Sequence, residues 1–315
     1  MNQNIADYDK AGYDYEKYWQ DEKVARGYEN RIESSTIRKF LPKETTDGWF
    51  CDLGGGFGRL YDVYKNSYTN TIIADYSLDS LKKAHNRIMN HELGIMDKGN
   101  PNPNVFFIAM NAYHTPFKSD VLDYLLSIRM MHHMEDVPSV ISEISRVLKP
   151  KGKLLLEFAN KKHFFEVIRA LFGRSKMKPF SLEPSQRGDL FYGFHPKFMR
   201  NEVKNKELQI NKEVSVSNLR STLVKKILPV PIMVGIDKLF QPIFSLLKFG
   251  PSIYIFAEKH PNIPEVIPTE LTIQDILKCP KCGCQNLIFL KPEVRCKECE
   301  KTYPIVDGVY DFRVE

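Results

Sequence analysis

The sequence predicts an α/β fold built on a mainly parallel sheet, with a small metal-binding module near the C-terminal end. Three observations predict it. Short apolar segments alternate with amphipathic helical segments over residues 1–160, which is typical of parallel strands joined by crossover helices. A glycine-rich stretch, Asp52-Leu-Gly-Gly-Gly-Phe-Gly58, directly follows the first apolar segment. Two Cys-x-x-Cys pairs, Cys279–Cys282 and Cys296–Cys299, have the spacing of a tetrahedral zinc site.

The elements of the first half follow in chain order. Residues 1–45 are expected to be helical and rich in aromatic side chains. Helices are expected at about 78–93 and 137–148, the second because apolar residues recur there at the spacing of one helical face. Short apolar runs predict five strands, at 49–53, 71–75, 105–109, 121–128 and 153–158.

Beyond residue 160 the pattern is less regular. We expect a basic amphipathic helix at 161–172, an irregular loop at 173–195 and an alternating strand at 210–219. The very apolar stretch 223–249 contains prolines, which are expected to break it into short helices. A last strand is expected at 252–256.

The chain is expected to divide into a main domain, residues 1–260, a proline-rich linker, 261–270, and a small module, 271–315. A length of 315 residues suits one large domain and one small one. Five of the six cysteines lie between Cys279 and Cys299. This clustering favours metal binding over a disulfide framework.

Charge is unevenly distributed along the chain. Residues 161–250 carry 17 basic and 7 acidic side chains, whereas the whole chain has a net charge of +6. Such a stretch could face a phosphate backbone or an anionic lipid surface, or could be a solvated face. The first residues lack a basic segment followed by an apolar core, and no run of 18 apolar residues occurs. We therefore expect no signal peptide, no spanning helix, and a cytoplasmic location, with peripheral membrane contact left open.

The glycine stretch predicts a cradle for an adenosine-containing cofactor. A dinucleotide fingerprint would need glycine at position 59, which is Arg59, and no Gly-Lys-Ser/Thr follows to make a phosphate-binding P-loop. Instead, the acidic Asp52 precedes the glycines, and Asp75 ends the second expected strand about 20 residues later. A carboxylate at that position can accept hydrogen bonds from both hydroxyls of a ribose.

These stretches resemble class I S-adenosylmethionine-dependent methyltransferases, in particular the group that includes the ubiquinone/menaquinone-biosynthesis enzymes. The resemblance covers roughly residues 45–160 and implies a Rossmann-like seven-stranded sheet, here with a helical insertion and a small C-terminal zinc ribbon. The matching stretches are Cys51-Asp-Leu-Gly-Gly-Gly-Phe-Gly-Arg-Leu60, Ala74-Asp-Tyr-Ser-Leu-Asp-Ser-Leu81, Asn111-Ala-Tyr-His-Thr-Pro-Phe117, His132-His-Met-Glu-Asp136 and Ser145-Arg-Val-Leu-Lys-Pro-Lys-Gly-Lys-Leu154.

The resemblance also implies the residues that bind S-adenosylmethionine. It places Asp75 on the ribose and Tyr76 beside the adenine. Asn111 stands where the family usually has an aspartate that accepts from the adenine amino group, and an asparagine still offers a carbonyl oxygen. The cofactor-binding residues that we expect are Asp52, Gly54, Gly56, Gly58, Asp75, Tyr76, Asn111 and Ala112.

Two adjacent histidines are the candidate catalytic residues. His132 and His133 follow the fourth expected strand, at the sheet edge where ligands bind in this type of fold. Either could act as a general base or hold the substrate, or both could line the site passively. No Asp/Asn-Pro-Pro-aromatic element follows that strand, which disfavours methylation of the exocyclic amines of bases.

The cysteine module resembles the small zinc-ribbon protein that activates several tRNA and protein methyltransferases as a separate subunit. Tyr303-Pro-Ile-Val-Asp-Gly308 accompanies the cysteines in this resemblance. It implies a structural zinc ion held by Cys279, Cys282, Cys296 and Cys299, and a module that packs on its own methyltransferase domain. The competing expectation is a module that folds without metal.

Three functions remain open at this point. The first is methyl transfer to a small, apolar acceptor such as a lipid, a quinone or a secondary metabolite. Residues 161–250 would then shape the substrate site, and 223–249 would form a lid or touch a membrane surface. The second is a tRNA or rRNA methyltransferase with a built-in activator domain. The third is a non-catalytic protein that keeps the cofactor fold.

Overall fold

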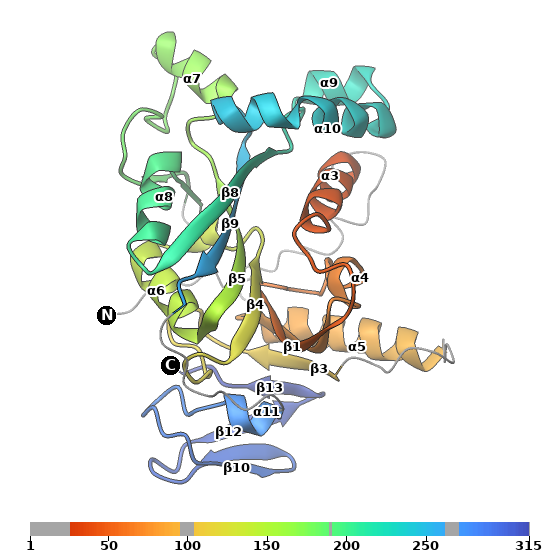
Figure 1. The fold of residues 1–315 in the computed structure, drawn as a ribbon, viewed down its shortest axis with the longest axis vertical. Coiled ribbons are helices and arrows are strands. Elements are labelled where there is room, and N and C mark those ends of the chain that lie inside the picture. Colours follow the sequence, from red (N-terminus) through yellow and green to blue (C-terminus); the bar gives the residue numbers. More distant parts are fainter. Residues whose placement is uncertain (1–25, 95–103, 189–190, 262–270, 315) are drawn as a thin grey trace.

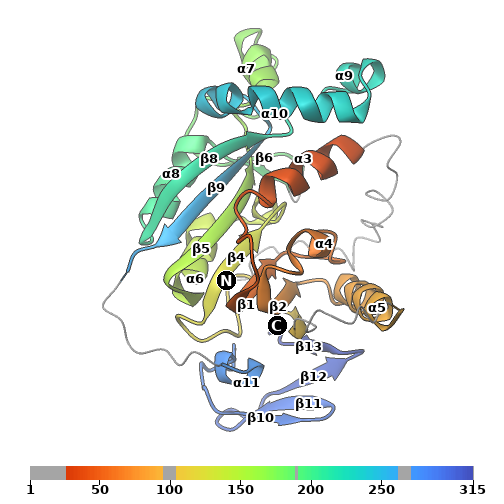
Figure 2. The ribbon, with the colours of Figure 1, turned by 45° about the vertical axis from the view of Figure 1, so that its right-hand side comes forward.

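The computed structural model describes residues 26–94, 104–188, 191–261 and 271–314 (Figures 1 and 2). The predicted helical segment 1–45 is described only from residue 26, where α3 (Gly27–Ile37) begins. Most of the predicted linker 261–270 lies outside the described residues.

Seven strands form the predicted α/β sheet, in the order β3-β2-β1-β4-β5-β9-β8. Neighbouring strands from β3 to β5 run parallel, β9 is antiparallel to β5, and β8 is antiparallel to β9. The Rossmann-like seven-stranded sheet is therefore confirmed. The strands are β1 (Thr46–Leu53), β2 (Tyr68–Asp75), β3 (Asn104–Ala109), β4 (Leu122–Ser127), β5 (Leu148–Ala159), β8 (Leu208–Val216) and β9 (Ser252–Lys259).

The C-terminal strands extend the same sheet beyond β3. β13 (Val309–Asp311) pairs parallel with β3, so that Val309 lies opposite Phe107. Three antiparallel strands follow outward from β13 and complete an eleven-stranded sheet. They are β12 (Thr302–Val306), β11 (Glu293–Cys296) and β10 (Leu287–Leu290).

Helices lie on both faces of the sheet and at its end (Figures 1 and 2). In α6 (Val137–Val147) the apolar face predicted from the spacing is buried, and Asp136 caps the helix by accepting from the Ser139 amide at 3.1 Å. The remaining helices are α4 (Tyr61–Tyr64), α5 (Leu78–Gly94), the 3-10 helix η1 (Met131–His133), α7 (Phe164–Leu171), α8 (Pro196–Lys204), α9 (Thr222–Ile227), α10 (Val230–Leu247) and α11 (Ile273–Ile276). A short ribbon of β6 (Ser185–Gln186) and β7 (Tyr192–Gly193) lies between α7 and α8 in the chain.

Two apolar cores flank the sheet, because successive strand side chains point to opposite faces. In β1, Trp49, Cys51 and Leu53 belong to one core, and Phe50 belongs to the other. Cys51 is fully buried. The first core continues into the C-terminal module, where it includes Tyr303.

The insertion differs from the sequence expectation at the β6–β7 ribbon, which lies within the predicted loop 173–195. The apolar stretch 223–249 breaks at Pro229, between α9 and α10, as expected, but α10 is 18 residues long and continues through Pro242. Among the described residues, α10 is also long and apolar enough to cross a membrane, by length and composition alone, with 17% of it buried. The sequence count of consecutive apolar residues did not select this helix because it contains the polar residues Asp237, Lys238 and Gln241. The expectation that no helix spans a membrane stays a prediction, since the criterion concerns length and composition alone.

Candidate cofactor site and metal site

The glycine stretch forms the turn that follows β1. Its glycines lack side chains, so neighbouring groups can approach the backbone closely. Gly54, Gly56 and Gly58 have φ values of +82°, +53° and +74°, a backbone conformation that side-chain-bearing residues rarely adopt. A Cβ atom at Gly54 would lie 2.7 Å from the Cβ atom of Met130. The loop can therefore pass close to a ligand and to the segment after β4.

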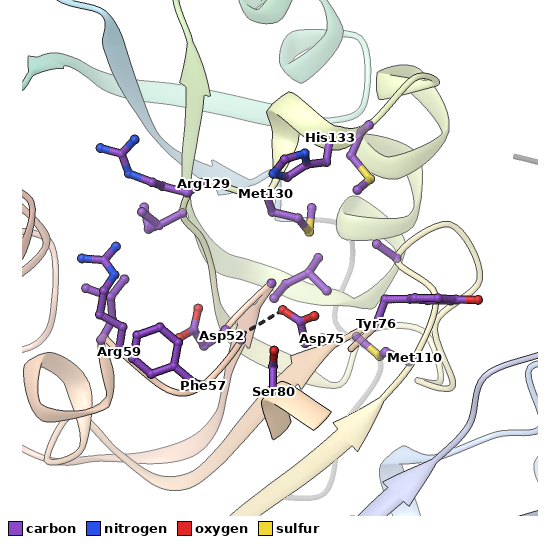
Figure 3. A pocket seen from close by; sticks show the side chains of 18 of the residues that line it. Asp52, Phe57, Arg59, Asp75, Tyr76, Ser80, Met110, Arg129, Met130 and His133 are labelled. Atoms are coloured by element: carbon purple, nitrogen blue, oxygen red, sulfur yellow. Dashed lines mark hydrogen bonds between the residues drawn. The ribbon is translucent and has the colours of Figure 1, made fainter. Parts of the chain in front are cut away.

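Asp75 is fixed at the C-terminal end of β2, facing the glycine loop. Its Oδ2 atom accepts from the Gly56 amide at 2.9 Å, and its Oδ1 atom accepts from the Ser77 amide at 2.9 Å. Asp75 is thus oriented by the backbone, and its side chain lines the pocket (Figure 3).

One pocket brings together seven of the eight cofactor-binding residues that were predicted. Gly58 is the exception, because it does not line the pocket. Instead, its carbonyl oxygen accepts from Arg87, and a Cβ atom there would press on Arg87 and Ile88 of α5. Its role is close packing of the loop on α5. The pocket residues that sequence reasoning missed include Phe57, Ser80, Met110, Tyr113, Arg129 and Met134.

Arg129 is the missed residue with the clearest structural role. It follows β4, has a φ of +62°, and donates its backbone amide to Glu157 at 2.9 Å. Its side chain is paired with Glu33 of α3, which also accepts from Arg59 at 3.0 Å. These charges hold the pKa of the buried Glu33 carboxyl below its usual value, against the effect of burial. The sequence gives no signal for a pair 96 residues apart.

Asp52 lies beneath the glycine loop and is almost fully buried. The Tyr64 hydroxyl donates to its Oδ2 atom at 2.8 Å. Burial raises the pKa of Asp52 to about 7, although the Tyr64 hydrogen bond and the Arg59 charge oppose the shift. We therefore expect Asp52 to change charge near neutral pH.

At the other end of the pocket, the Asn111 carbonyl oxygen accepts from the Tyr113 amide at 2.9 Å. One of its lone pairs is thereby used to shape the loop, and one remains for a ligand. Tyr76 lines the same pocket, and Arg313 lies over its ring. These residues, with Asp75 and the open glycine loop, fit an adenosine-containing ligand.

The two histidines occupy different positions on η1. His133 lines both the cofactor pocket and a second, larger cavity, whereas His132 lines only the second cavity. Their ring centroids are 4.1 Å apart. Burial lowers the pKa of His132 well below its ordinary value, and the charges of His133 and Arg129 add to the effect. His132 is therefore neutral near pH 7.

The second cavity extends from Arg129 and His133 to α7 and the end of α10. Several arginines line it, among them Arg220, whose pKa is lowered by burial and by the neighbouring charges of Arg129 and Arg26. Five phenylalanines line it as well: Phe164, Phe165, Phe191, Phe244 and Phe249.

The four predicted cysteine ligands meet at one point in the C-terminal module. Their sulfur atoms lie within 4.8 Å of one another, with Cys279 and Cys299 at 3.7 Å and Cys282 and Cys296 at 3.5 Å. Four thiolates at about 2.3 Å from a tetrahedral zinc ion would be about 3.8 Å apart. The cluster is therefore compatible with a zinc site. Cys284 stays outside it, since its sulfur accepts from the Asn286 amide at 3.3 Å.

Comparison with known proteins finds a partial family match and a shared fold. Residues 51–156 match the family model described as a methyltransferase domain. A solved magnesium protoporphyrin IX methyltransferase from Synechocystis PCC 6803 superimposes with a TM-score of 0.51 at 14% identity, covering 80% of this chain and 95% of that one. A structure from Listeria monocytogenes, described as an S-adenosylmethionine dependent methyltransferase, superimposes with a TM-score of 0.52 at 15% identity. The alignment covers 75% of this chain and 100% of that one. The solved structures thus share the Rossmann-like methyltransferase fold of this chain, and the family match is confined to residues 51–156.

Curated relatives match less than half of the chain. An uncharacterized protein of Methanocaldococcus jannaschii is 32% identical over 128 residues, which is 41% of this chain and 47% of that protein. The ubiquinone/menaquinone biosynthesis C-methyltransferase UbiE of Shewanella frigidimarina is 30% identical over 131 residues, 40% of this chain and 48% of the relative. The chain thus spans about half the length of the curated relatives that it matches.

Proposed function

We propose that this protein transfers a methyl group from S-adenosylmethionine to a small, largely apolar acceptor, such as a lipid, a quinone or a secondary metabolite. One observation carries the proposal: the cofactor pocket and the second cavity share Arg129 and His133. An acceptor in the second cavity would therefore meet the cofactor at these two residues.

Methyl transfer depends more on alignment of the acceptor with the methyl group than on strong acid–base catalysis. The acceptor's electron pair forms the new bond to the methyl carbon while the carbon–sulfur bond breaks and its electrons remain on sulfur. Holding the two partners in line supplies most of the rate. Of the two histidines, His133 is the better placed to hold the acceptor or accept its proton, because it lines both pockets.

The lining of the second cavity supports an acceptor with an apolar body and a polar head. Its lining combines phenylalanines, among them Phe164 and Phe165, with the basic side chains of Arg129 and Arg220. Distant relatives named as ubiquinone/menaquinone biosynthesis C-methyltransferases point in the same direction, toward a small molecule.

The alternative is a tRNA or rRNA methyltransferase. The excess of basic residues in 161–250 and the cysteine module, which resembles a methyltransferase activator, favour it. The many exposed apolar side chains of the same insertion do not, since RNA-binding surfaces combine basic residues with aromatic stacking platforms rather than exposed leucines.

We further propose that the C-terminal module binds structural zinc and acts as a built-in activator subunit, covering the sheet edge at β3. β13 pairs with β3 at this edge. The Lys82 amine on α5 also lies 3.5 Å from the Asp307 carboxylate of the module. With five of the six cysteines between Cys279 and Cys299, a reducing compartment such as the cytoplasm is the proposed location.

A labelling experiment separates the two functions. The purified protein would be incubated with S-adenosylmethionine labelled in its methyl group, in parallel with a total lipid extract and with total RNA. We expect label in the organic-solvent fraction only, in a product whose mass has increased by one methylene unit. Label in RNA alone would instead support the second function.

A further inference from the structure

One end of the molecule exposes an unusual number of large apolar side chains. They lie on α7, on the loop after it, and on α9 and α10, which share the same end of the molecule in Figures 1 and 2, remote from the C-terminal module. We call this set the apolar end. Its most exposed members are Leu171 (74%), Phe172 (75%), Phe180 (60%), Ile227 (76%), Leu239 (72%), Ile243 (53%) and Leu246 (81%).

The apolar end is continuous across elements that are far apart in the sequence. The Phe164 amide at the start of α7 donates to the Phe249 carbonyl oxygen at 3.0 Å, just after α10, and the two rings are 5.4 Å apart. Monomeric soluble proteins rarely leave so large an apolar area exposed unless it meets a partner. We therefore expect the apolar end to bind a partner.

The opposite face of α10 is fastened to the protein by polar contacts. Asp237 is buried and accepts from Tyr28 and from the Asn218 amide at 3.1 Å, and Gln241 accepts from the Lys39 amine at 2.9 Å. A helix that crossed a bilayer would have to break these contacts and expose their polar groups to hydrocarbon. α10 is therefore suited to lie along a membrane surface and not to span it.

Basic residues accompany the apolar end. Exposed basic side chains stand in the loop after α7, on α9 and on α10: Arg174, Lys176, Lys178, Lys226 and Lys238. An amphipathic surface that combines apolar side chains with lysines and arginines is the kind that binds the interface of an anionic bilayer. A second copy of this chain would instead bring like charges together.

We propose that the apolar end docks on an anionic lipid bilayer, and that the second cavity receives its acceptor from that bilayer. The cavity reaches the apolar end through Phe164, Phe165 and Phe249, each of which is partly exposed, and ends at Arg129 and His133. The proposed docking is argued from the surface residues and does not depend on the enzyme's activity. The delivery of an acceptor to the second cavity rests on the proposed function.

The test is sedimentation of the full-length protein with vesicles, without cofactor or acceptor, so that it is independent of the methyltransferase proposal. We expect binding to vesicles of phosphatidylcholine with one third phosphatidylglycerol, and weak binding to phosphatidylcholine alone. The variant Leu171→Glu/Leu246→Glu should lower the partition coefficient at least about tenfold. Its control is Met89→Glu/Leu290→Glu, which adds the same charges at exposed apolar residues far from the apolar end and should bind as the wild type does.

Two further measurements test the role of the basic residues and the possibility of self-association. Lys176→Gln/Lys238→Gln should weaken binding to the anionic vesicles by about fivefold or more and leave binding to neutral vesicles unchanged. Equal binding by the wild type and by Leu171→Glu/Leu246→Glu would overturn the proposal. So would light scattering that shows a lipid-free dimer which the same variant converts to a monomer, because the occupant would then be a second copy.

Discussion

The Arg313 guanidinium lies over the ring of Tyr76, 5.7 Å from its centroid, and donates to the Tyr76 carbonyl oxygen at 3.3 Å. Asp311 holds the guanidinium in place, accepting from Nε and Nη2 at 2.8 and 2.7 Å. Tyr76 lines the cofactor pocket. The last described part of the C-terminal module thus supports a residue of the cofactor site that lies 237 positions earlier in the chain.

Removal of this contact should weaken cofactor binding without affecting the metal. Arg313→Ala should lower the affinity for S-adenosylhomocysteine about three- to tenfold, since a cation–π contact contributes about 1 kcal/mol. Calorimetric titration measures the affinity, and atomic absorption measures the zinc. Arg295→Ala, at an exposed arginine of β11, is the control. Equal affinities of the two variants would show that the module does not support the pocket.

The stability of the cofactor-free protein should depend on Asp52. Since the folded-state pKa of this residue is about 7, above its ordinary value of 3.8, the folded protein holds the Asp52 proton more tightly than the unfolded chain. The resulting stability is fully present below about pH 4 and is lost as the pH rises through 7.

Asp52→Asn removes this pH dependence. Between pH 4 and pH 8, the free energy of unfolding of the variant should rise relative to that of the wild type by up to about 4 kcal/mol. The difference in melting temperature between the two proteins should therefore grow by several degrees over this range. A difference that is flat over this range would contradict the raised pKa.

Zinc removal should unfold the C-terminal module first. Cys296→Ser should abolish stoichiometric zinc and lower the free energy of unfolding of the module by more than about 5 kcal/mol. Hydrogen exchange should then show faster exchange in β3, because β13 pairs with it. Cys284→Ser is the matched control and should retain one zinc per chain. Retention of zinc by Cys296→Ser, or loss by Cys284→Ser, would refute the ligand set.

The two histidines should differ in their effects on methyl transfer. His133→Asn should lower product formation about a hundredfold, because a general base contributes at least that much and His133 lines both cavities. His132→Asn should have a smaller effect, through packing on Phe191 at 4.9 Å. Cells that express each variant at the same level would be compared by mass spectrometry of the methylated product. A larger loss for His132→Asn would reverse the assignment.

The sequence predicted the sheet and the glycine loop because both depend on local signals. Short apolar runs became β1 to β5, and the positive φ values of the loop occur at glycines. The cysteine spacing likewise placed four sulfur atoms together.

The remaining features depend on contacts between distant residues, which a single sequence does not reveal. Arg129 pairs with Glu33, and Tyr28 donates to Asp237, 209 residues away. Distant residues also hold α10 through Asp237 and Gln241, and the helix continues through Pro242. Glycine spacing alone does not distinguish contact with a ligand from close packing, and the packing of Gly58 on Arg87 and Ile88 of α5 appears only in the structure.

The most direct test of the account is calorimetric titration of the purified protein with S-adenosylmethionine and S-adenosylhomocysteine. We expect one site per chain, and at least about a tenfold loss of affinity for Asp75→Asn, since hydrogen bonds to a charged group contribute about 1.5–3 kcal/mol. Asp79→Asn, at an exposed carboxylate on α5, should bind normally. Folded protein that takes up neither ligand, or equal affinities for the two variants, would contradict the proposed cofactor site.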